Sequence, residues 1–311
     1  MNGTVKIFKV ISDFDGIDLQ GLLYEPNAKK RGLVLILHGM CEHKGRYESF
    51  MKFLCTYGYV AVCYDQRGHG DSVKTKEDRG YFYDRTGEGI VKDVSSVVQY
   101  LKTQYPDLPI ALFGHSMGSL IARCYLQNYD DTIDKALICG TPKKNKYAGV
   151  GIFVARCISM LKGDRYRSKT LTYVSVGKGD KRFKKEGKSA WLCRNPKLRE
   201  CYRADEKGQF LFTANGFENL FRLLRQTYKK KAYALKNPDL PIFFLSGEHD
   251  PVMDMQEDWA DAVNIMPKIG YQNVSGKLYA GMRHDLINDY GYPEVRDDIL
   301  AFLEDKTEKI K

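Results

Sequence analysis

Short apolar runs alternate with helical patterns along much of this chain, and this alternation constrains the fold more than any other feature. Six runs have the length and composition of buried strands: 33–37, 59–64, 110–113, 136–139, 242–245 and 277–279. Between most of them lie patterns with helical spacing: 47–57, 89–105, 118–128, 256–264 and 294–303. Strands and helices that alternate in this way form a mostly parallel sheet flanked by helices. The sequence therefore predicts an α/β fold.

Two further segments precede the first buried run. KIFKVIS (6–12) and IDLQGLLYEP (17–26) alternate apolar and polar residues on either side of Asp15 and Gly16, which predicts a β-hairpin. With 311 residues and 43% hydrophobic content, the chain is long enough for one large α/β domain with an insert.

The alternation stops between residues 141 and 238, and this interval also differs in charge. Residues 143–238 contain 25 lysines and arginines against 7 acids, a net charge of +18, whereas the remainder has 24 against 32, a net charge of −8. We therefore predict a core over 1–141 and 238–311 and an inserted, mainly helical lid over 142–237.

Two stretches of the predicted lid, 149–161 and 217–228, have amphipathic helical spacing. The apolar positions of the first recur on one stripe: Val150, Phe153, Val154, Cys157, Met160 and Leu161. We expect this stripe to pack in a core, and the alternative is that it lines the path of an acyl chain.

The basic charge of the predicted lid has two interpretations. It forms a solvated charged face, or it attracts an anionic lipid surface or a phosphate-bearing substrate, because each lysine or arginine near a bilayer adds about 1 kcal/mol. Nucleic acid is not an expected partner, because the lysine runs lack a recognition motif.

The cysteines and the N-terminal segment indicate the cellular setting. None of the eight cysteines shows metal-ligand spacing such as C-x-x-C, so we predict free, mostly packed thiols and no metal site. Residues 1–16 lack a basic region followed by an apolar block, and the longest uncharged run, 108–122, is shorter than a bilayer span. We expect a cytoplasmic protein, with any membrane contact peripheral.

The segment GHSMG (114–118) follows a predicted strand and opens a predicted helix. A sharp turn at such a junction exposes the serine hydroxyl above the edge of the sheet, and flanking glycines avoid Cβ clashes. The positive end of the following helix favours a developing oxyanion. Ser116 is therefore the candidate nucleophile.

A serine nucleophile needs a base to remove its proton, and the chain has six histidines. His284 follows the last predicted strand, so it leaves the carboxyl end of the sheet, where Ser116 also lies. His115 adjoins the serine in sequence, but we expect its side chain to point away. The sequence therefore predicts His284 as the base.

The base needs a carboxylate to fix its tautomer and stabilise its cation. Asp250 follows the predicted strand 242–245 at the same edge of the sheet. Its competitors are Glu248, Asp254 and Asp285. The chain order Ser116, Asp250, His284 is that of an α/β-hydrolase.

The oxyanion needs backbone N–H donors. The amide of Met117, directly after the nucleophile, is the first predicted donor, and the amide of Met40 in the loop after strand 33–37 is the second. His38, Arg67 and His69 are expected to fix loops by hydrogen bonds rather than to catalyse.

Five ordered motifs together resemble one known family. HGMCEHKGRY (38–47), DQRGHGDS (65–72), GHSMG, GEHDPV (247–252) and the final His284 are similar to the monoglyceride lipase and lysophospholipase group of α/β-hydrolases, which also has the serine aminopeptidase label. The resemblance covers about residues 5–305. It implies the α/β-hydrolase fold, a triad of Ser116, Asp250 and His284, an oxyanion hole from Met40 and Met117, and a lid at the basic block.

Two positions depart from the family pattern: Cys41 replaces a usual glycine and Lys44 a usual serine. The Cys41 thiol is expected to line the pocket, and further substrate contacts are predicted at His38, Phe153 and Cys157.

The predicted function is hydrolysis of a carboxylic ester through an acyl-enzyme, with no metal or organic cofactor. The resemblance implies a monoacyl lipid substrate, a monoacylglycerol or a lysophospholipid. One alternative is amide hydrolysis of the aminopeptidase type, which would favour an acidic group in the lid. The other is a non-catalytic, ligand-binding protein with the hydrolase fold.

Overall fold

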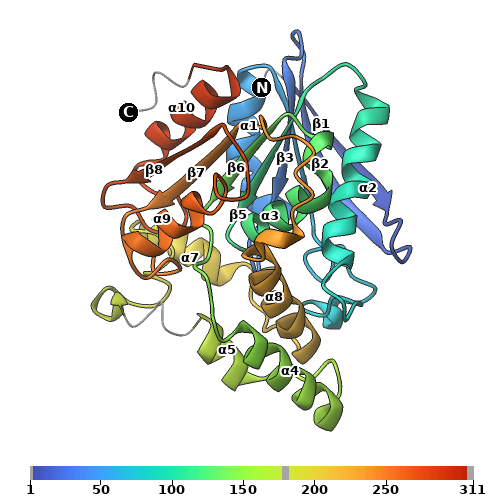
Figure 1. The fold of residues 1–311 in the computed structure, drawn as a ribbon, viewed down its shortest axis with the longest axis vertical. Helices are drawn as coiled ribbons and strands as arrows, with labels where there is room; N and C mark the ends of the chain where they lie inside the picture. The colour runs from blue at the N-terminus through green and yellow to red at the C-terminus, as the bar shows by residue number, and fades with distance from the viewer. Residues whose placement is uncertain (1–2, 177–181, 307–311) are drawn as a thin grey trace.

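The computed structural model describes residues 3–176 and 182–306, and the strands in this part of the chain form one sheet (Figure 1). The strands are β1 (Gly3–Ile11), β2 (Asp18–Pro26), β3 (Gly32–Leu37), β4 (Tyr59–Tyr64), β5 (Ile110–His115), β6 (Lys135–Cys139), β7 (Ile242–Gly247) and β8 (Val274–Tyr279). Their order across the sheet is β1-β2-β4-β3-β5-β6-β7-β8. The pairings β1–β2 and β2–β4 are antiparallel and the others are parallel, so the predicted hairpin and mostly parallel sheet are confirmed.

The five helices predicted for the core all form, within two residues of the expected ends. They are α1 (Glu48–Thr56), α2 (Gly89–Gln104), α3 (Met117–Tyr129), α9 (Gln256–Asn264) and α10 (Tyr292–Leu303). Alternate side chains of β3 separate two apolar layers: Leu35 packs in the layer that contains α2 and α3, and Ile36 packs in the layer that contains α1 and α10. Because both faces are covered, the central strands are apolar at nearly every position.

Between β6 and β7 the chain leaves the sheet. In the described part of this interval it forms helices and no strand: α4 (Ala148–Lys162), α5 (Lys169–Val176), α7 (Pro196–Ala204) and α8 (Ala214–Thr227). Helix α8 packs on both α3 and α4. Figure 1 shows α4 and α5 at the lower end of the molecule, beyond the sheet. The division into a core and a lid stays a prediction.

The apolar stripe of α4 faces solvent, so the expectation that it packs in a core is wrong. Four of its members are exposed by 60, 68, 69 and 84%: Val150, Phe153, Met160 and Leu161. The helix instead buries small residues such as Ala155. A Cβ at Gly151 would lie 2.8 Å from the ring of Phe221 in α8, which shows how closely the two helices approach. This contact leaves the large apolar side chains outside.

All eight cysteines are free thiols, as the sequence predicts. Cys201 is exposed, whereas Cys63, Cys124 and Cys139 are buried. Within residues 3–176 and 182–306, none of the helices has the length and apolar character needed to span a bilayer.

Candidate active site

Ser116 occupies the turn between β5 and α3 in a conformation that non-glycine residues rarely adopt. Its φ is 54° and its ψ is −118°. Its amide donates a hydrogen bond to the Cys139 carbonyl at 2.9 Å, which attaches the turn to the end of β6. Such strained backbone is characteristic of functional positions, and here it exposes the serine at the edge of the sheet.

The two glycines that flank Ser116, Gly114 and Gly118, leave no room for a side chain, as the sequence predicts. A Cβ at Gly114 would lie 2.4 Å from the carbonyl oxygen of Gly118. A Cβ at Gly118 would lie 2.1 Å from the carbonyl oxygen of Leu37 in β3. Backbone therefore occupies both positions, and only glycine fits.

The structure pairs His284 with Asp250. His284 Nδ1 lies 2.8 Å from Asp250 Oδ2, and both residues are buried. The other carboxylate oxygen, Oδ1, accepts the backbone N–H of Val252 at 2.9 Å, and the Ser246 hydroxyl donates to Oδ2 at 3.4 Å. These bonds hold the carboxylate in position to accept Nδ1–H, which leaves Nε2 of the imidazole as the basic nitrogen.

The end of β6 brings Ser116, Asp250 and His284 together. A Cβ at Gly140 would lie 3.2 Å from Cε1 and Nδ1 of His284 and 3.4 Å from Asp250 Oδ2. The preceding residue, Cys139, accepts the Ser116 amide. The Ser116 hydroxyl is not hydrogen-bonded to any of the described residues. In free enzymes such a catalytic bond often forms only when substrate binds.

The other three acids have different partners. Glu248 Oε2 accepts the Gly281 amide at 3.0 Å, and Asp254 lies 2.7 Å from Lys143 Nζ. Asp285 Oδ2 lies 3.2 Å from Arg46 Nη2. Of the four candidates, Asp250 is the acid whose carboxylate contacts the His284 ring in the described structure.

Two rings flank His284. The ring centroid of Trp191 lies 5.3 Å from that of His284, and the ring centroid of His115 lies 4.8 Å from it. Trp191 comes from the interval between β6 and β7, and sequence reasoning missed it. The available signal was weak: the chain has only two tryptophans, and one of them falls in the predicted lid.

His115 points away from Ser116 into a buried polar cluster. Its Nε2 lies 3.1 Å from the carbonyl oxygen of His284, and its Nδ1 lies 2.9 Å from the Tyr47 hydroxyl and 3.6 Å from Glu42 Oε2. Burial lowers the pKa of the imidazole, but the hydrogen bond and charge of Glu42 raise it above its ordinary value overall.

Glu42 connects this cluster to the loop that follows β3. Its Oε2 accepts the Gly39 amide and the Tyr47 hydroxyl, each at 2.8 Å. Burial raises the pKa of the carboxyl, but the charges of Arg46 and His115 and the hydrogen bonds lower it well below its ordinary value overall. Glu42 is therefore a buried carboxylate that fixes the loop beside Ser116.

This fixed loop places the backbone of residues 38–40 against the candidate nucleophile. A Cβ at Gly39 would lie 3.2 Å from the Cβ of Ser116. Glu42 occupies the Gly39 amide, whereas the Met40 amide has no hydrogen-bond acceptor among the described residues. Met117 is the first residue of α3, where amides have no partner within the helix. Both amides are thus free for a ligand.

The predicted substrate contacts lie in different surroundings. Both ring nitrogens of His38 contact protein groups, the Gly39 carbonyl at 2.8 Å and the Gln66 amide at 3.0 Å. Cys41 has a φ of 55°, a conformation that favours glycine, and its thiol donates to the Phe210 carbonyl at 3.3 Å. Phe153 and Cys157 lie on α4, the first exposed and the second partly buried. Their contact with substrate stays a prediction.

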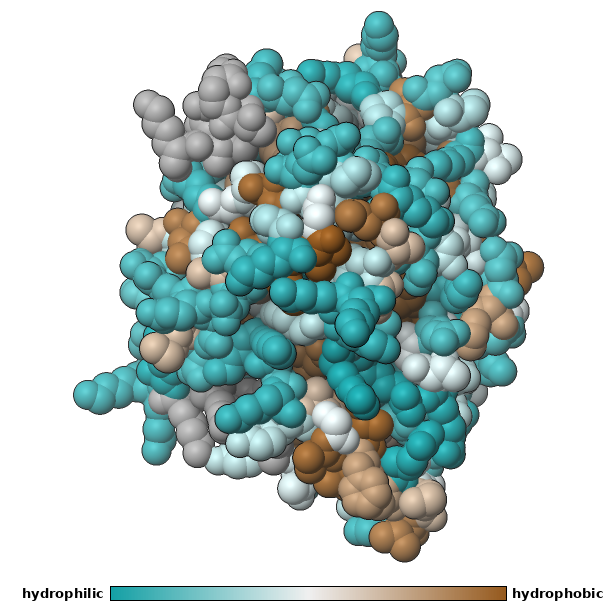
Figure 2. All heavy atoms as spheres, viewed as in Figure 1, coloured by the Kyte–Doolittle hydropathy of each residue, from teal (hydrophilic) through white to brown (hydrophobic). Residues whose placement is uncertain are grey.

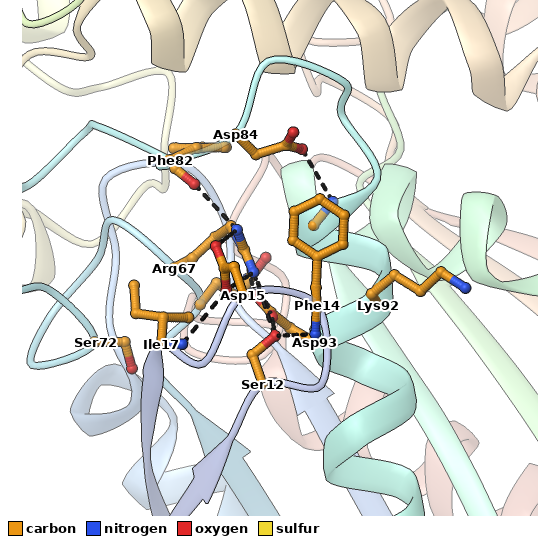
Figure 3. Close-up of polar contacts among 12 residues, drawn as sticks. Ser12, Phe14, Asp15, Ile17, Arg67, Ser72, Phe82, Asp84, Lys92 and Asp93 are labelled. Atoms are coloured by element: carbon orange, nitrogen blue, oxygen red, sulfur yellow. Dashed lines mark hydrogen bonds and ion pairs between the residues drawn. The ribbon is translucent and has the colours of Figure 1, made fainter.

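Arg67 fixes loops, as the sequence predicts. Its guanidinium is fully buried and donates to Asp93 Oδ2 at 2.6 Å, to Asp93 Oδ1 at 2.7 Å and to Asp15 Oδ2 at 2.9 Å. Figure 3 shows these groups converging between the β1–β2 turn and α2. The arginine therefore joins the hairpin, the loop after β4 and α2 without reaching the candidate triad.

Within residues 3–176 and 182–306, no group of three or more His, Cys, Asp or Glu side chains is arranged to hold a metal ion.

Comparison with known proteins identifies the family. The family described as "Serine aminopeptidase, S33" matches residues 28–291 of this chain. The chain belongs to this family. It is therefore a serine-type hydrolase with the α/β-hydrolase fold.

Individual relatives of this chain match nearly its whole length. The monoacylglycerol lipase of Mycolicibacterium smegmatis is 24% identical over 93% of this chain and 95% of that protein. The human monoglyceride lipase is 25% identical over 92% of this chain and 85% of that protein. A thermostable carboxyl esterase from Bacillus coagulans has a TM-score of 0.87 and 24% identity, with 99% of each chain covered, which shows a shared fold.

Proposed function

We propose that this protein hydrolyses the ester bond of a monoacyl lipid through a triad of Ser116, Asp250 and His284. The observation that carries the proposal is the 2.8 Å contact between His284 Nδ1 and Asp250 Oδ2, at the strand end that also holds the Ser116 turn. The pair orients the imidazole so that its Nε2 can act as a general base.

In the proposed reaction, Ser116 Oγ attacks the ester carbonyl carbon while His284 Nε2 takes the hydroxyl proton. The Met40 and Met117 amides stabilise the tetrahedral oxyanion. His284 then gives the proton to the leaving alcohol, and the acyl-enzyme remains on Ser116. Water attacks this ester with His284 again as base, and the free acid leaves.

The substrate class rests on the relatives and on the surroundings of the site. Two full-length relatives are named for monoacylglycerol and monoglyceride lipase activity, which supports a glycerol monoester or a similar single-chain lipid. The amide alternative is less well supported, because the predicted lid has 7 acids against 25 basic residues and offers few groups to hold a substrate amine.

The experiment that tests the catalytic assignment compares wild type with Ser116→Ala on nitrophenyl esters of increasing chain length. We expect turnover by wild type and a loss of at least about a thousandfold in the variant. Turnover that survives in Ser116→Ala would refute the nucleophile. Cleavage of aminoacyl nitroanilides in preference to every ester would favour the amide alternative, and absence of any turnover would favour a binding protein.

We also propose that α4 rests on a lipid surface. Val150, Phe153, Met160 and Leu161 form an exposed apolar face, and Figure 2 shows apolar atoms gathered at the lower end of the molecule, over α4. Basic side chains on or next to this helix, Lys146, Arg156, Lys162 and Arg165, favour an anionic surface.

Vesicle sedimentation tests this contact. We expect wild type to sediment with phosphatidylglycerol-containing vesicles more than with pure phosphatidylcholine vesicles, and Phe153→Ser with Leu161→Ser to sediment less with both. Equal sedimentation of wild type and this double variant would refute a role of α4.

A further inference from the structure

A groove separate from the candidate active site lies between α8 and the helices α2 and α3, and has a volume of about 760 Å³. The part of α3 that lines it begins at Cys124, about 12 Å along the helix axis from Ser116 at 1.5 Å per residue. Figure 3 shows Lys92, one of its lining residues, extending from α2 away from the buried Arg67 cluster. The groove therefore opens on a different part of the surface from the Ser116 turn.

The wall of this groove is strongly basic. Its charged members are five cations and one acid: Lys92, Arg222, Arg225, Lys229, Lys236 and Glu88. The net charge of the wall is therefore +4. The cations come from α2, from α8 and from the segment after α8, so tertiary folding brings them together. Like charges that lie close together repel one another, which lowers the stability of the fold unless an anion neutralises them.

Nearby acids neutralise only part of this charge. Arg222 Nη2 lies 2.8 Å from Glu218 Oε1, and Lys236 Nζ lies 3.4 Å from Asp131 Oδ1. Lys92 Nζ donates to a neutral group, the Tyr129 hydroxyl, at 2.7 Å.

Arg225 lies in the last turn of α8, Lys229 follows two residues after the end of this helix, and both are exposed. Neither side chain forms an ion pair or hydrogen bond with a residue in 3–176 or 182–306. They are therefore the two cations of the groove best placed to receive a ligand.

The uncharged residues that line the groove supply apolar and amide groups. Val91, Ile152 and Leu223 supply apolar surface. Gln127 and Gln226 are joined by two hydrogen bonds of 2.9 Å, so their amides are held in place. Apolar walls around a charged cleft strengthen its attraction for an anion, because they exclude water from part of the field.

We propose that this groove binds a phosphate group, presented by a soluble phosphate ester or by the headgroup of an anionic lipid. Guanidinium groups bind phosphate through paired N–H donors, and ammonium groups add charge at the rim. The volume leaves room for a glycerol-sized group beside the phosphate. The inference does not depend on the proposed hydrolysis, because none of the groove residues belongs to the candidate triad.

The test uses Ser116→Ala protein, so that no lipid is hydrolysed, and a matched pair of double variants. Arg225→Gln with Lys229→Gln removes two charges from the groove. Lys184→Gln with Lys185→Gln removes two exposed charges from the same interval of the chain, outside the groove. The probes are glycerol 3-phosphate in calorimetry, and phosphatidylcholine vesicles with and without phosphatidylglycerol in sedimentation.

We expect the groove variant to bind at least one phosphate probe about tenfold more weakly than the parent, because two charge-assisted contacts are lost, and the control to stay within about twofold. If the groove variant binds glycerol 3-phosphate more weakly than the parent does, a soluble ester supplies the phosphate group. If it binds phosphatidylglycerol vesicles more weakly, a lipid headgroup supplies it. The α4 variant Phe153→Ser should bind glycerol 3-phosphate as the parent does.

Three results would overturn the site. These are unchanged binding by the groove variant in both arms, equal losses in the two double variants, or tighter binding of an acidic peptide, poly-glutamate, than of both phosphate probes. A failure of catalysis would not affect these readings, since none of them measures turnover.

Discussion

His115 Nε2 lies 3.1 Å from the backbone oxygen of His284, although the two residues are 169 positions apart in the chain. The opposite nitrogen of the same ring lies 3.6 Å from Glu42 Oε2, which also accepts the Gly39 amide. A single buried imidazole therefore joins the loop beside Ser116 to the backbone of the proposed base. The position of His115 next to the nucleophile serves this link rather than proton transfer.

The Glu42–His115 pair should make stability depend on pH. A carboxyl whose pKa is lowered by folding contributes stability above its ordinary value of 4.5 and loses it as pH falls through the folded value. A histidine whose pKa is raised contributes fully below its ordinary value of 6.5 and loses it as pH rises through the folded value.

We therefore expect Glu42→Gln to lower the free energy of unfolding most between about pH 4.5 and 6.5, by roughly 3 kcal/mol. Urea unfolding of wild type and variant over a pH series measures this difference. A difference that stays constant from pH 4.5 to pH 9 would contradict the assignment.

Asp250→Asn should reduce kcat on nitrophenyl esters by about a thousandfold to ten-thousandfold with little change in thermal stability. The amide cannot stabilise the imidazolium and favours the wrong tautomer of His284. Glu248→Gln is the matched control, because this acid lies nearby in sequence and its oxygen accepts the Gly281 amide. Similar losses in the two variants would remove Asp250 from the triad.

Gly140→Ala should impair the site, because its side chain would crowd His284 and strain the backbone. The residue has a φ of 56°, and its Cβ would lie 3.2 Å from the His284 ring. We expect at least a tenfold loss of kcat, with a loss of about 1–2 kcal/mol in stability for the left-handed conformation. Gly149→Ala is the control, because no atom lies within 4 Å of its added Cβ. Wild-type activity in Gly140→Ala would show that His284 tolerates a shift.

Two buried arginines should respond differently to replacement by methionine. Arg67→Met leaves Asp93 buried without its cation and should cost about 3–5 kcal/mol. The Arg123 guanidinium donates a long hydrogen bond to the Thr141 hydroxyl at 3.3 Å and lies over the Tyr228 ring at 4.5 Å. Its Nε and Nη2 are buried without partners in the described structure.

Arg123→Met should therefore change stability by less than about 1.5 kcal/mol, or increase it, because a flexible apolar side chain of similar size replaces an unpaired buried charge. Urea unfolding of both variants at pH 7 measures the contrast. Equal destabilisation by the two substitutions would show that Arg123 has a stabilising partner.

Much of the core was predictable because local patterns and tertiary burial agree there. The strand at 59–64 is buried on both faces, so its apolar run is unambiguous. The stripe on α4 was predicted wrongly, because periodicity shows that a helix has an apolar face but not which face its neighbour covers. Small residues at the α8 contact, Gly151 and Ala155, decided that question.

The sequence by itself determined the alternation of strands and helices, the Ser116 turn with its two glycines, and the candidate positions of base and acid after later strands. These features depend on local periodicity and on the rule that parallel strands end at one edge of a sheet. Only the tertiary structure decided that Asp250 rather than Asp285 contacts His284, that Glu42 fixes the loop at Gly39, and that five cations meet in one groove. Each of these depends on distances between residues far apart in the chain, which sequence spacing does not encode.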